Sequence, residues 1–173
     1  PSTHYFYRNQ HDLPIMALTD FDLVLFGGGG DLSMRKLIPA LYARHRAGDL
    51  PATAQIICVG RQTLSDAEFI EALNQNAKSN IHEKAFKQDA WDAFCHCVRY
   101  VSLDATDASS YQPLIDCLRN DPALTRVFYL AMPPTLFAKI CHNLNERGLA
   151  TENSRVVLEK PLGRDLASAK QIN

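Results

Sequence analysis

Four consecutive glycines, Gly27 to Gly30, stand between an apolar run that ends at Phe26 and a helical pattern that begins near Leu37. Glycine lets the backbone approach a diphosphate closely, and the N-terminus of a following helix offers free N–H groups and the positive end of its dipole. The order of strand, glycine turn and helix predicts a dinucleotide-binding βαβ unit. The spacing, Gly27-x-x-Gly30-x-x-Ser33, differs from the common G-x-G-x-x-G, so the run alone is also compatible with a flexible hairpin.

A basic residue, Arg61, follows the second predicted strand, residues 55–60. NAD-selective folds present an acidic residue at this place to the ribose 2′-hydroxyl, whereas a guanidinium pairs with a 2′-phosphate. Arg61 therefore favours NADP. The alternative is a solvated charge at a strand end.

Charged residues also follow the glycines. A carboxylate beside a diphosphate would be repulsive, so Asp31 is expected to act structurally, at a helix start and four residues before Arg35. Arg35 and Lys36 either face the cleft or belong to the solvated surface of the helix.

The elements that must position these residues alternate along the chain. Short apolar strands are predicted at residues 22–26, 55–60, 99–103, 126–131 and 155–159. Helical patterns separate them at 31–47, from 65 with a second stretch at 82–97, at 107–119 and 134–147, and from 165 onward. This alternation predicts an α/β fold, a Rossmann-like doubly wound parallel sheet with helices on both faces.

Local signals support several of these boundaries. Ser65 and Glu68 form a predicted capping box, and Gly48 and Gly148 stand at helix stops. Pro39 lies inside the first helical pattern and removes one backbone hydrogen bond, so that helix is expected to bend there or to begin late.

Composition restricts the class of protein. The chain has 173 residues, is 46% hydrophobic and carries a net charge of −1, which suits one globular domain and argues against nucleic acid or an anionic membrane as partner. It has no run of about 18 apolar residues, and a cytoplasmic location is expected. Residues 1–15 are expected to be a leader foreign to the domain or disordered, and residues 16–173 to form the domain.

The five cysteines are an odd number without shared spacing, which indicates reduced thiols. Cys95, His96 and Cys97 cluster, but adjacent ligands without a second pair do not make a tetrahedral zinc site. No metal site is predicted, and Cys95 and Cys97 are expected to flank the turn before Val98.

Three strings along the chain resemble one family. Residues 27–37, GGGGDLSMRKL, are similar to the nucleotide-binding signature of glucose-6-phosphate dehydrogenase, G-A-S/T-G-D-L-A/S-x-R-K-L. Residues 157–163, VLEKPLG, resemble its E-K-P-x-G signature, and residues 126–134, RVFYLAMPP, its fourth strand and following loop. The chain thus resembles the N-terminal NADP-binding domain of the bacterial type of this enzyme. Gly28 and Gly29 depart from the pattern, losing a side-chain hydroxyl at the phosphate loop and adding backbone entropy.

The resemblance implies roles for particular residues. It places at the cofactor Gly27, Gly28, Gly29, Gly30, Asp31, Leu32, Arg61, Tyr129 and Lys160. Lys160 and Lys36 are implied to bind substrate, and Pro161 to be a cis proline that orients the nicotinamide. From the residues alone, Tyr129 could equally pack in the core and Lys160 could stand at a simple strand exit.

The resemblance also implies an activity, the step of the pentose phosphate pathway that oxidises glucose 6-phosphate to 6-phosphogluconolactone with formation of NADPH. A hydride passes from C1 of the sugar to C4 of the nicotinamide while a histidine takes the hydroxyl proton. The family's R-I-D-H-Y-L-G-K-E segment and its large C-terminal substrate and dimerisation domain are absent from this chain, and none of the six histidines fits the catalytic motif. The chain is expected to bind cofactor but to be inactive alone, with a homo-oligomer as the full-length parent. The alternative is a free-standing, non-catalytic NADP(H)-binding or assembly module.

Overall fold

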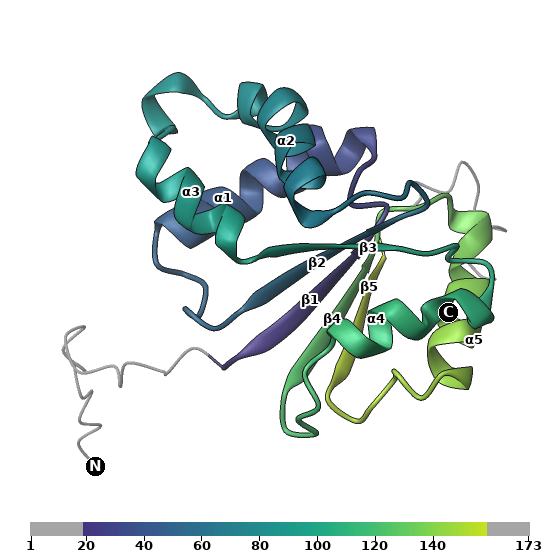
Figure 1. The fold of residues 1–173 in the computed structure, drawn as a ribbon. Coiled ribbons are helices and arrows are strands. Elements are labelled where there is room, and N and C mark those ends of the chain that lie inside the picture. Colours follow the sequence, from purple (N-terminus) through teal and green to yellow (C-terminus); the bar gives the residue numbers. More distant parts are fainter. Residues whose placement is uncertain (1–18, 159–173) are drawn as a thin grey trace, which may run out of the picture.

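A computed structural model describes residues 19–158. Its centre is a five-stranded parallel sheet in the order β3-β2-β1-β4-β5 (Figure 1). The strands are β1 Phe21–Phe26, β2 Gln55–Gly60, β3 Val98–Ser102, β4 Thr125–Leu130 and β5 Ser154–Leu158. The order reverses between β1 and β4, as in doubly wound folds. The predicted fold class is confirmed.

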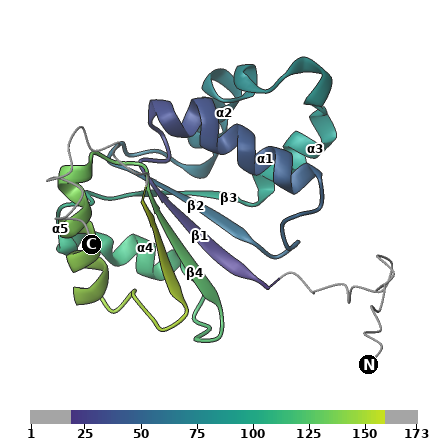
Figure 2. The same ribbon diagram turned by 180° about the vertical axis from the view of Figure 1, so that it is seen from behind.

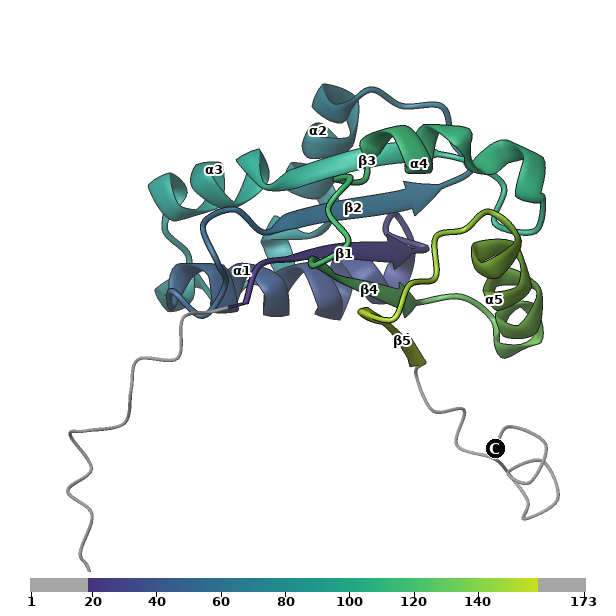
Figure 3. The same ribbon diagram turned by 90° about the horizontal axis from the view of Figure 1, so that it is seen from below.

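Helices cover both faces of this sheet (Figures 2 and 3). On one face lie α1 Ile38–Arg46, α2 Asp66–Asn76 and α3 Gln88–His96, and on the other α4 Gln112–Cys117 and α5 Phe137–Glu146. Successive side chains of a strand point to opposite faces, so β1 supplies both cores. Leu23 and Leu25 pack toward α1, α2 and α3, while Val24 and Phe26 pack toward α4 and α5.

Helix ends follow the predicted signals. The Ser65 hydroxyl accepts the Glu68 amide, and the Glu68 carboxylate accepts the Ser65 amide, which completes the capping box. Gly48 and Gly148 adopt φ values of 76° and 68° just past α1 and α5, conformations that favour glycine.

Pro39 is accommodated in a way that the sequence did not predict. The helix starts directly after the glycine turn, and its residues Ser33–Leu37 form a π-helical turn that leads into α1. The Ile38 amide reaches back to the Ser33 carbonyl, and Pro39, which has no N–H, follows within the first turn of α1. The helix therefore does not begin late.

Several predicted boundaries were wrong by one or more residues. β3 and β4 each begin and end one residue early, and β5 runs over Ser154–Leu158, with Glu159 outside the described residues. In the stretch 82–97, α3 begins only at Gln88, after a 3-10 turn at Glu83–Ala85. The helices predicted at 107–119 and 134–147 begin as 3-10 turns and end at Cys117 and Glu146, respectively. The expected helix from residue 165 and the residue 1–15 leader lie outside the described residues.

Tertiary contacts explain the late start of α3. The buried Tyr42 hydroxyl accepts the Lys87 amide at 2.9 Å and lies 3.3 Å from the Lys87 carbonyl. Phe86 packs beside Tyr42 and Trp91. These contacts hold residues 86–87 extended, and α3 begins after them.

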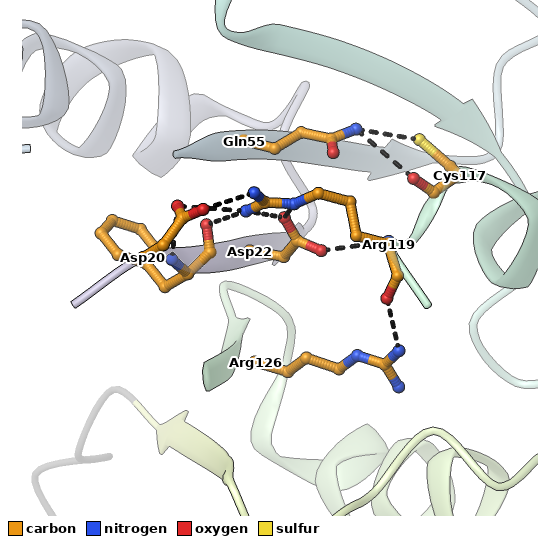
Figure 4. Close-up of polar contacts among 7 residues, drawn as sticks. Asp20, Asp22, Gln55, Cys117, Arg119 and Arg126 are labelled. Carbon is orange, nitrogen blue, oxygen red and sulfur yellow. Dashed lines mark hydrogen bonds and ion pairs between the residues drawn. The ribbon is translucent and has the colours of Figure 1, made fainter. Parts of the chain in front are cut away.

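A charged cluster fixes the amino end of β1 (Figure 4). Arg119, just past α4, donates to Asp20 at 2.6 Å and to Asp22 at 2.8 Å. Asp22 is fully buried, so this guanidinium neutralises a charge that would otherwise be costly. The Arg119 carbonyl in turn accepts the Arg126 guanidinium, which ties this loop after α4 to β4.

Candidate functional site

A cleft of about 580 Å³ lies at the carboxyl ends of the strands, next to the point where the strand order reverses. Ligands of open α/β sheets bind at this place. The strands β2 and β3 and the loops after β1, β2, β3 and β4 contribute residues that line it: Gly27, Gly29, Gly30, Gly60, Arg61, Gln62, Tyr100, Leu103, Asp104, Ala105, Thr106, Met132 and Pro133. The cleft brings Gly27, Gly29 and Gly30 together with Arg61, four of the predicted site residues.

The turn after β1 requires glycine at its first position. Gly27 has a φ of 80°, and a Cβ there would collide with the Ala131 carbonyl oxygen at the end of β4. The buried Ser33 hydroxyl donates to the Gly27 carbonyl at 2.8 Å and closes the turn. The G-x-x-G-x-x-S spacing thus builds a tight turn rather than a flexible hairpin.

The remaining glycines differ from one another. The amides of Gly27 and Gly28 both donate to the Val59 carbonyl, and Gly28 packs directly over Cys58. Gly29 and Gly30 are exposed, and a Cβ at Gly29 would meet only Phe69, at 3.8 Å. The first amides of the helix have no intrahelical acceptor. An open glycine surface beside these amides fits a diphosphate group.

The charges after the glycines face solvent. Arg35 and Asp31 form the expected pair four residues apart, at 3.2 Å, with 63% and 80% of their side chains exposed. Lys36 is exposed and Leu32 half-buried. Within the described residues, Asp31, Leu32 and Lys36 do not line the cleft.

Arg61 lies in the loop after β2, and a hydrogen bond from Tyr100 fixes this loop. The Tyr100 hydroxyl donates to the Gln62 carbonyl at 2.9 Å, and its ring stacks on Phe69 at 4.6 Å. A Cβ at Gly60 would lie 2.6 Å from that hydroxyl, so glycine leaves the room that Tyr100 needs. Burial raises the pKa of Tyr100, which keeps the donor protonated at neutral pH.

The loop after β3 contributes cleft residues that the sequence prediction missed. Asp104 accepts the Thr106 amide at 2.9 Å and the Thr106 hydroxyl at 2.7 Å. These hydrogen bonds, helped by the positive charge of Arg61, lower the pKa of Asp104 against the opposing effect of burial. The strand order could have predicted these residues, because a parallel strand next to β2 places its following loop at the same edge of the sheet as the loop after β2.

Two buried side chains support this loop from below. The Tyr111 hydroxyl and the Asn143 amide both donate to the Ala105 carbonyl, at 2.7 and 3.0 Å. Asn143 is fully buried in α5, and Tyr111 lies in the 3-10 turn directly before α4. Burial raises the pKa of Tyr111 to about 12, so it remains a donor.

Other predicted site residues lie elsewhere. Tyr129 packs against the core on the α1, α2 and α3 side, beside Leu25 and Val127, and not in the cleft of the described residues. Lys160 and Pro161 lie outside the described residues.

The cysteines are free, and Cys97 caps α3 just before β3, as expected for the Cys95–Cys97 pair. Burial raises the pKa of Cys58 to about 12, so this thiol below Gly28 is inert. Over residues 19–158, no three His, Cys, Asp or Glu side chains gather as metal ligands would. None of the helices described is long and apolar enough to cross a membrane.

The fold and the cleft together define a Rossmann-like dinucleotide-binding domain. The sequence profile described as "Glucose-6-phosphate dehydrogenase, NAD binding domain" matches residues 24–173, so the chain belongs to this family, whose cofactor is a nicotinamide dinucleotide.

Known relatives agree with this assignment. The chain is 46% identical over 156 residues to glucose-6-phosphate 1-dehydrogenase of Mycolicibacterium smegmatis, covering 88% of this chain and 32% of that enzyme. It is 38% identical over 159 residues to the Rhizobium meliloti enzyme, covering 92% and 32%. The chain therefore spans about a third of the length of these relatives.

Solved structures show the same fold. The crystal structure of glucose-6-phosphate 1-dehydrogenase from Mycobacterium avium superposes with a TM-score of 0.78 at 33% identity, covering 88% of this chain and 32% of that one. A glucose-6-phosphate dehydrogenase in complex with its substrate glucose-6-phosphate gives a TM-score of 0.76 at 30% identity, covering 90% and 33%.

Proposed function

We propose that this chain is the NADP-binding domain of a glucose-6-phosphate dehydrogenase, which oxidises glucose 6-phosphate to 6-phosphogluconolactone. The observation that carries the proposal is the joint placement of the glycine turn and Arg61 in one cleft. Family membership and the relatives of the preceding subsection supply the substrate and the reaction class. The cofactor, when bound, accepts a hydride at the nicotinamide.

The residues of this chain would bind and orient that cofactor. Gly29 and the first helical amides present N–H groups to the diphosphate, while Gly27 keeps the backbone close to β4. The Gly30 amide donates to the Gly27 carbonyl at 2.9 Å and closes the turn instead. Arg61 lines the cleft and can pair bidentately with a 2′-phosphate, a geometry that suits a guanidinium. By family resemblance, Lys160 and Lys36 contact the sugar phosphate, Pro161 orients the nicotinamide, and Tyr129, Asp31 and Leu32 support the cofactor site.

The cleft also bears on the alternative of a non-catalytic NADP(H)-binding module. Among the described residues that line the cleft there is no histidine to take the hydroxyl proton. Catalysis would then depend on groups outside this lining, and we place them in the part of the longer relatives that this chain does not match. The full-length enzyme is proposed to be a homo-oligomer that works in the cytoplasm.

Calorimetric titration with NADP and NAD tests the proposal. Because a charge-assisted contact contributes about 1.5 to 3 kcal/mol, NADP should bind at least about tenfold more tightly than NAD, and Arg61→Ala should remove most of that preference. Arg44→Ala is the matched control, since Arg44 is an exposed arginine paired with Asp49 away from the cleft. Equal affinities for the two cofactors, or an Arg61→Ala variant with an unchanged ratio, would contradict the proposal.

A further inference from the structure

Arg61 and Asp104 stand on neighbouring strand ends in the same cleft. In the β2–β3 pair, Gly60 lies opposite Ser102, and the Leu103 amide donates to the Gly60 carbonyl at 2.9 Å. Arg61 follows Gly60 directly, and Asp104 follows Leu103. One side of the cleft therefore presents a guanidinium and a carboxylate from adjacent loops.

The Asp104 carboxylate is held in place before any ligand arrives. Its Oδ1 accepts both the amide and the hydroxyl of Thr106. The Ser110 hydroxyl accepts the Asp104 amide at 3.1 Å and donates to the Asp104 carbonyl at 2.8 Å. These bonds leave Oδ2 for other partners, and the loop below is fixed through the Ala105 carbonyl.

We propose that Asp104 is a second residue that determines cofactor selectivity, accepting the ribose 2′-hydroxyl of NAD and repelling the 2′-phosphate of NADP. The inference rests on the proposed function, because it concerns the same cleft. NAD-selective folds place an acidic residue after β2 for this hydroxyl. In this chain Arg61 occupies that place, and the carboxylate comes from the next strand.

The two charges have opposite effects on the two cofactors. A 2′-phosphate carries up to two negative charges, so Arg61 attracts it while Asp104 repels it. The lowered pKa of Asp104 keeps the carboxylate ionised at neutral pH. The preference for NADP is consequently smaller than Arg61 alone would produce, and the domain accepts NAD as well.

Asp107 offers a matched control. Its Oδ1 accepts the Ser109 amide at 2.9 Å and the Ser109 hydroxyl at 2.7 Å, the arrangement that Asp104 makes with Thr106. Asp107 lies in the same loop but does not line the cleft described above. Asp104→Asn and Asp107→Asn therefore remove the same charge from equivalent local turns, one inside the cleft and one outside.

The test measures dissociation constants of the whole chain for NADP and NAD by calorimetry at low salt. Asp104→Asn should raise the ratio of NADP to NAD affinity about three- to tenfold, as expected for one partly solvated charge acting on a phosphate. Asp107→Asn should leave the ratio unchanged. Should Asp104→Asn lower the melting temperature, Asp104→Ser keeps an oxygen acceptor for the turn and carries the same expectation.

The outcomes separate this inference from the proposed function. If Arg61→Ala lowers the ratio but neither Asp104 variant raises it, the inference is overturned and the NADP proposal stands. If the Asp104 variants raise the ratio while Arg61→Ala does nothing, Asp104 is supported and the role of Arg61 is rejected. If the chain binds neither cofactor, both proposals fail.

Discussion

Gly28 and Gly29 are neighbours in the chain but meet different surroundings. A Cβ at Gly29 would make only an ordinary contact with Phe69, whereas one at Gly28 would collide with Cys58. The sequence alone could not separate these two departures from the family signature, because the difference depends on what β2 places below the turn.

Gly29→Ser should strengthen NADP binding about two- to fivefold, because a hydroxyl at the phosphate loop adds one hydrogen bond and removes backbone freedom from the unbound turn. Calorimetric titration checks this. Ala43→Ser, at an exposed position of α1 outside the cleft, is the control and should change nothing. An unchanged affinity in Gly29→Ser would show that this position does not face the diphosphate.

Gly28→Ala should instead destabilise the fold by about 1 to 3 kcal/mol, the usual cost of overpacking. The new Cβ would lie 2.5 Å from the Cβ and 2.9 Å from the Cα of Cys58, so backbone must move. Urea unfolding of this variant beside Gly29→Ser gives the comparison. Equal midpoints for both variants would contradict the described packing of the turn on β2.

At the scale of elements, local signals predicted what depends on local chemistry. The capping box at Ser65 and the stops at Gly48 and Gly148 were confirmed because each involves residues within one turn. The predicted start of α3 was wrong because Tyr42, more than 40 residues away in the sequence, holds residues 86–87 in an extended conformation. The glycines and Arg61 predicted the cleft. The sequence did not predict Asp104 as a cleft residue, because its position there depends on the pairing of β3 with β2.

The loop that carries Arg61 depends on β3 through Tyr100. Tyr100→Phe removes the donor to the Gln62 carbonyl, which should cost about 1 kcal/mol of stability and lower the NADP to NAD affinity ratio about two- to threefold. Tyr42→Phe is the matched control, because it loses a hydroxyl that supports the approach to α3, far from Arg61. If both variants keep the ratio of the wild type, Tyr100 has only a structural role.

The Arg119 cluster predicts how stability depends on pH. The hydrogen bond that Asp20 accepts from Arg119 holds the pKa of the Asp20 carboxyl below its ordinary value of 3.8. Because the pKa of Asp20 is lower in the folded than in the unfolded chain, its ionised carboxylate stabilises the fold at pH values above the unfolded-state pKa. This stabilisation is lost as the pH falls through the folded-state pKa. Thermal melts from pH 7 to about 3 should show Asp20→Asn less stable than wild type at neutral pH, with the gap closing in acid. Asp49→Asn, at the exposed pair with Arg44, serves as control, and a constant gap for Asp20→Asn would refute the linkage.

At the scale of the whole molecule, the described strands end at the edge that carries the cleft, and the edge strand β5 is less covered than the central strands. The side chains of Val156, Val157 and Leu158 on the edge strand β5 are 45%, 38% and 39% exposed. Central strands of such sheets are buried on both faces, and β1 and β2 follow that rule. β5 does not follow it, so within the described residues the edge strand is less covered than the central strands that carry the glycine turn and Arg61.

The last prediction concerns catalysis by this chain alone. Its described cleft lining offers Asp104 and Tyr100 as titratable groups besides Arg61, and neither suits a general base. The lowered pKa of Asp104 weakens it as a proton acceptor, and the raised pKa of Tyr100 keeps it protonated. Positioning of two reactants and proton removal each contribute several orders of magnitude to a rate, so the 173-residue chain should form no NADPH from glucose 6-phosphate.

Absorbance at saturating NADP and glucose 6-phosphate measures this, with the full-length Mycolicibacterium smegmatis enzyme as positive control. Arg61→Ala, purified in parallel, distinguishes true turnover from a contaminating dehydrogenase, because a contaminant is indifferent to that substitution. NADPH formation that falls with Arg61→Ala would mean that the chain carries its own base, and the search for it would begin among the residues beyond Leu158. Binding without turnover would instead agree with a cofactor domain whose hydride acceptor is in place and whose proton acceptor is supplied elsewhere.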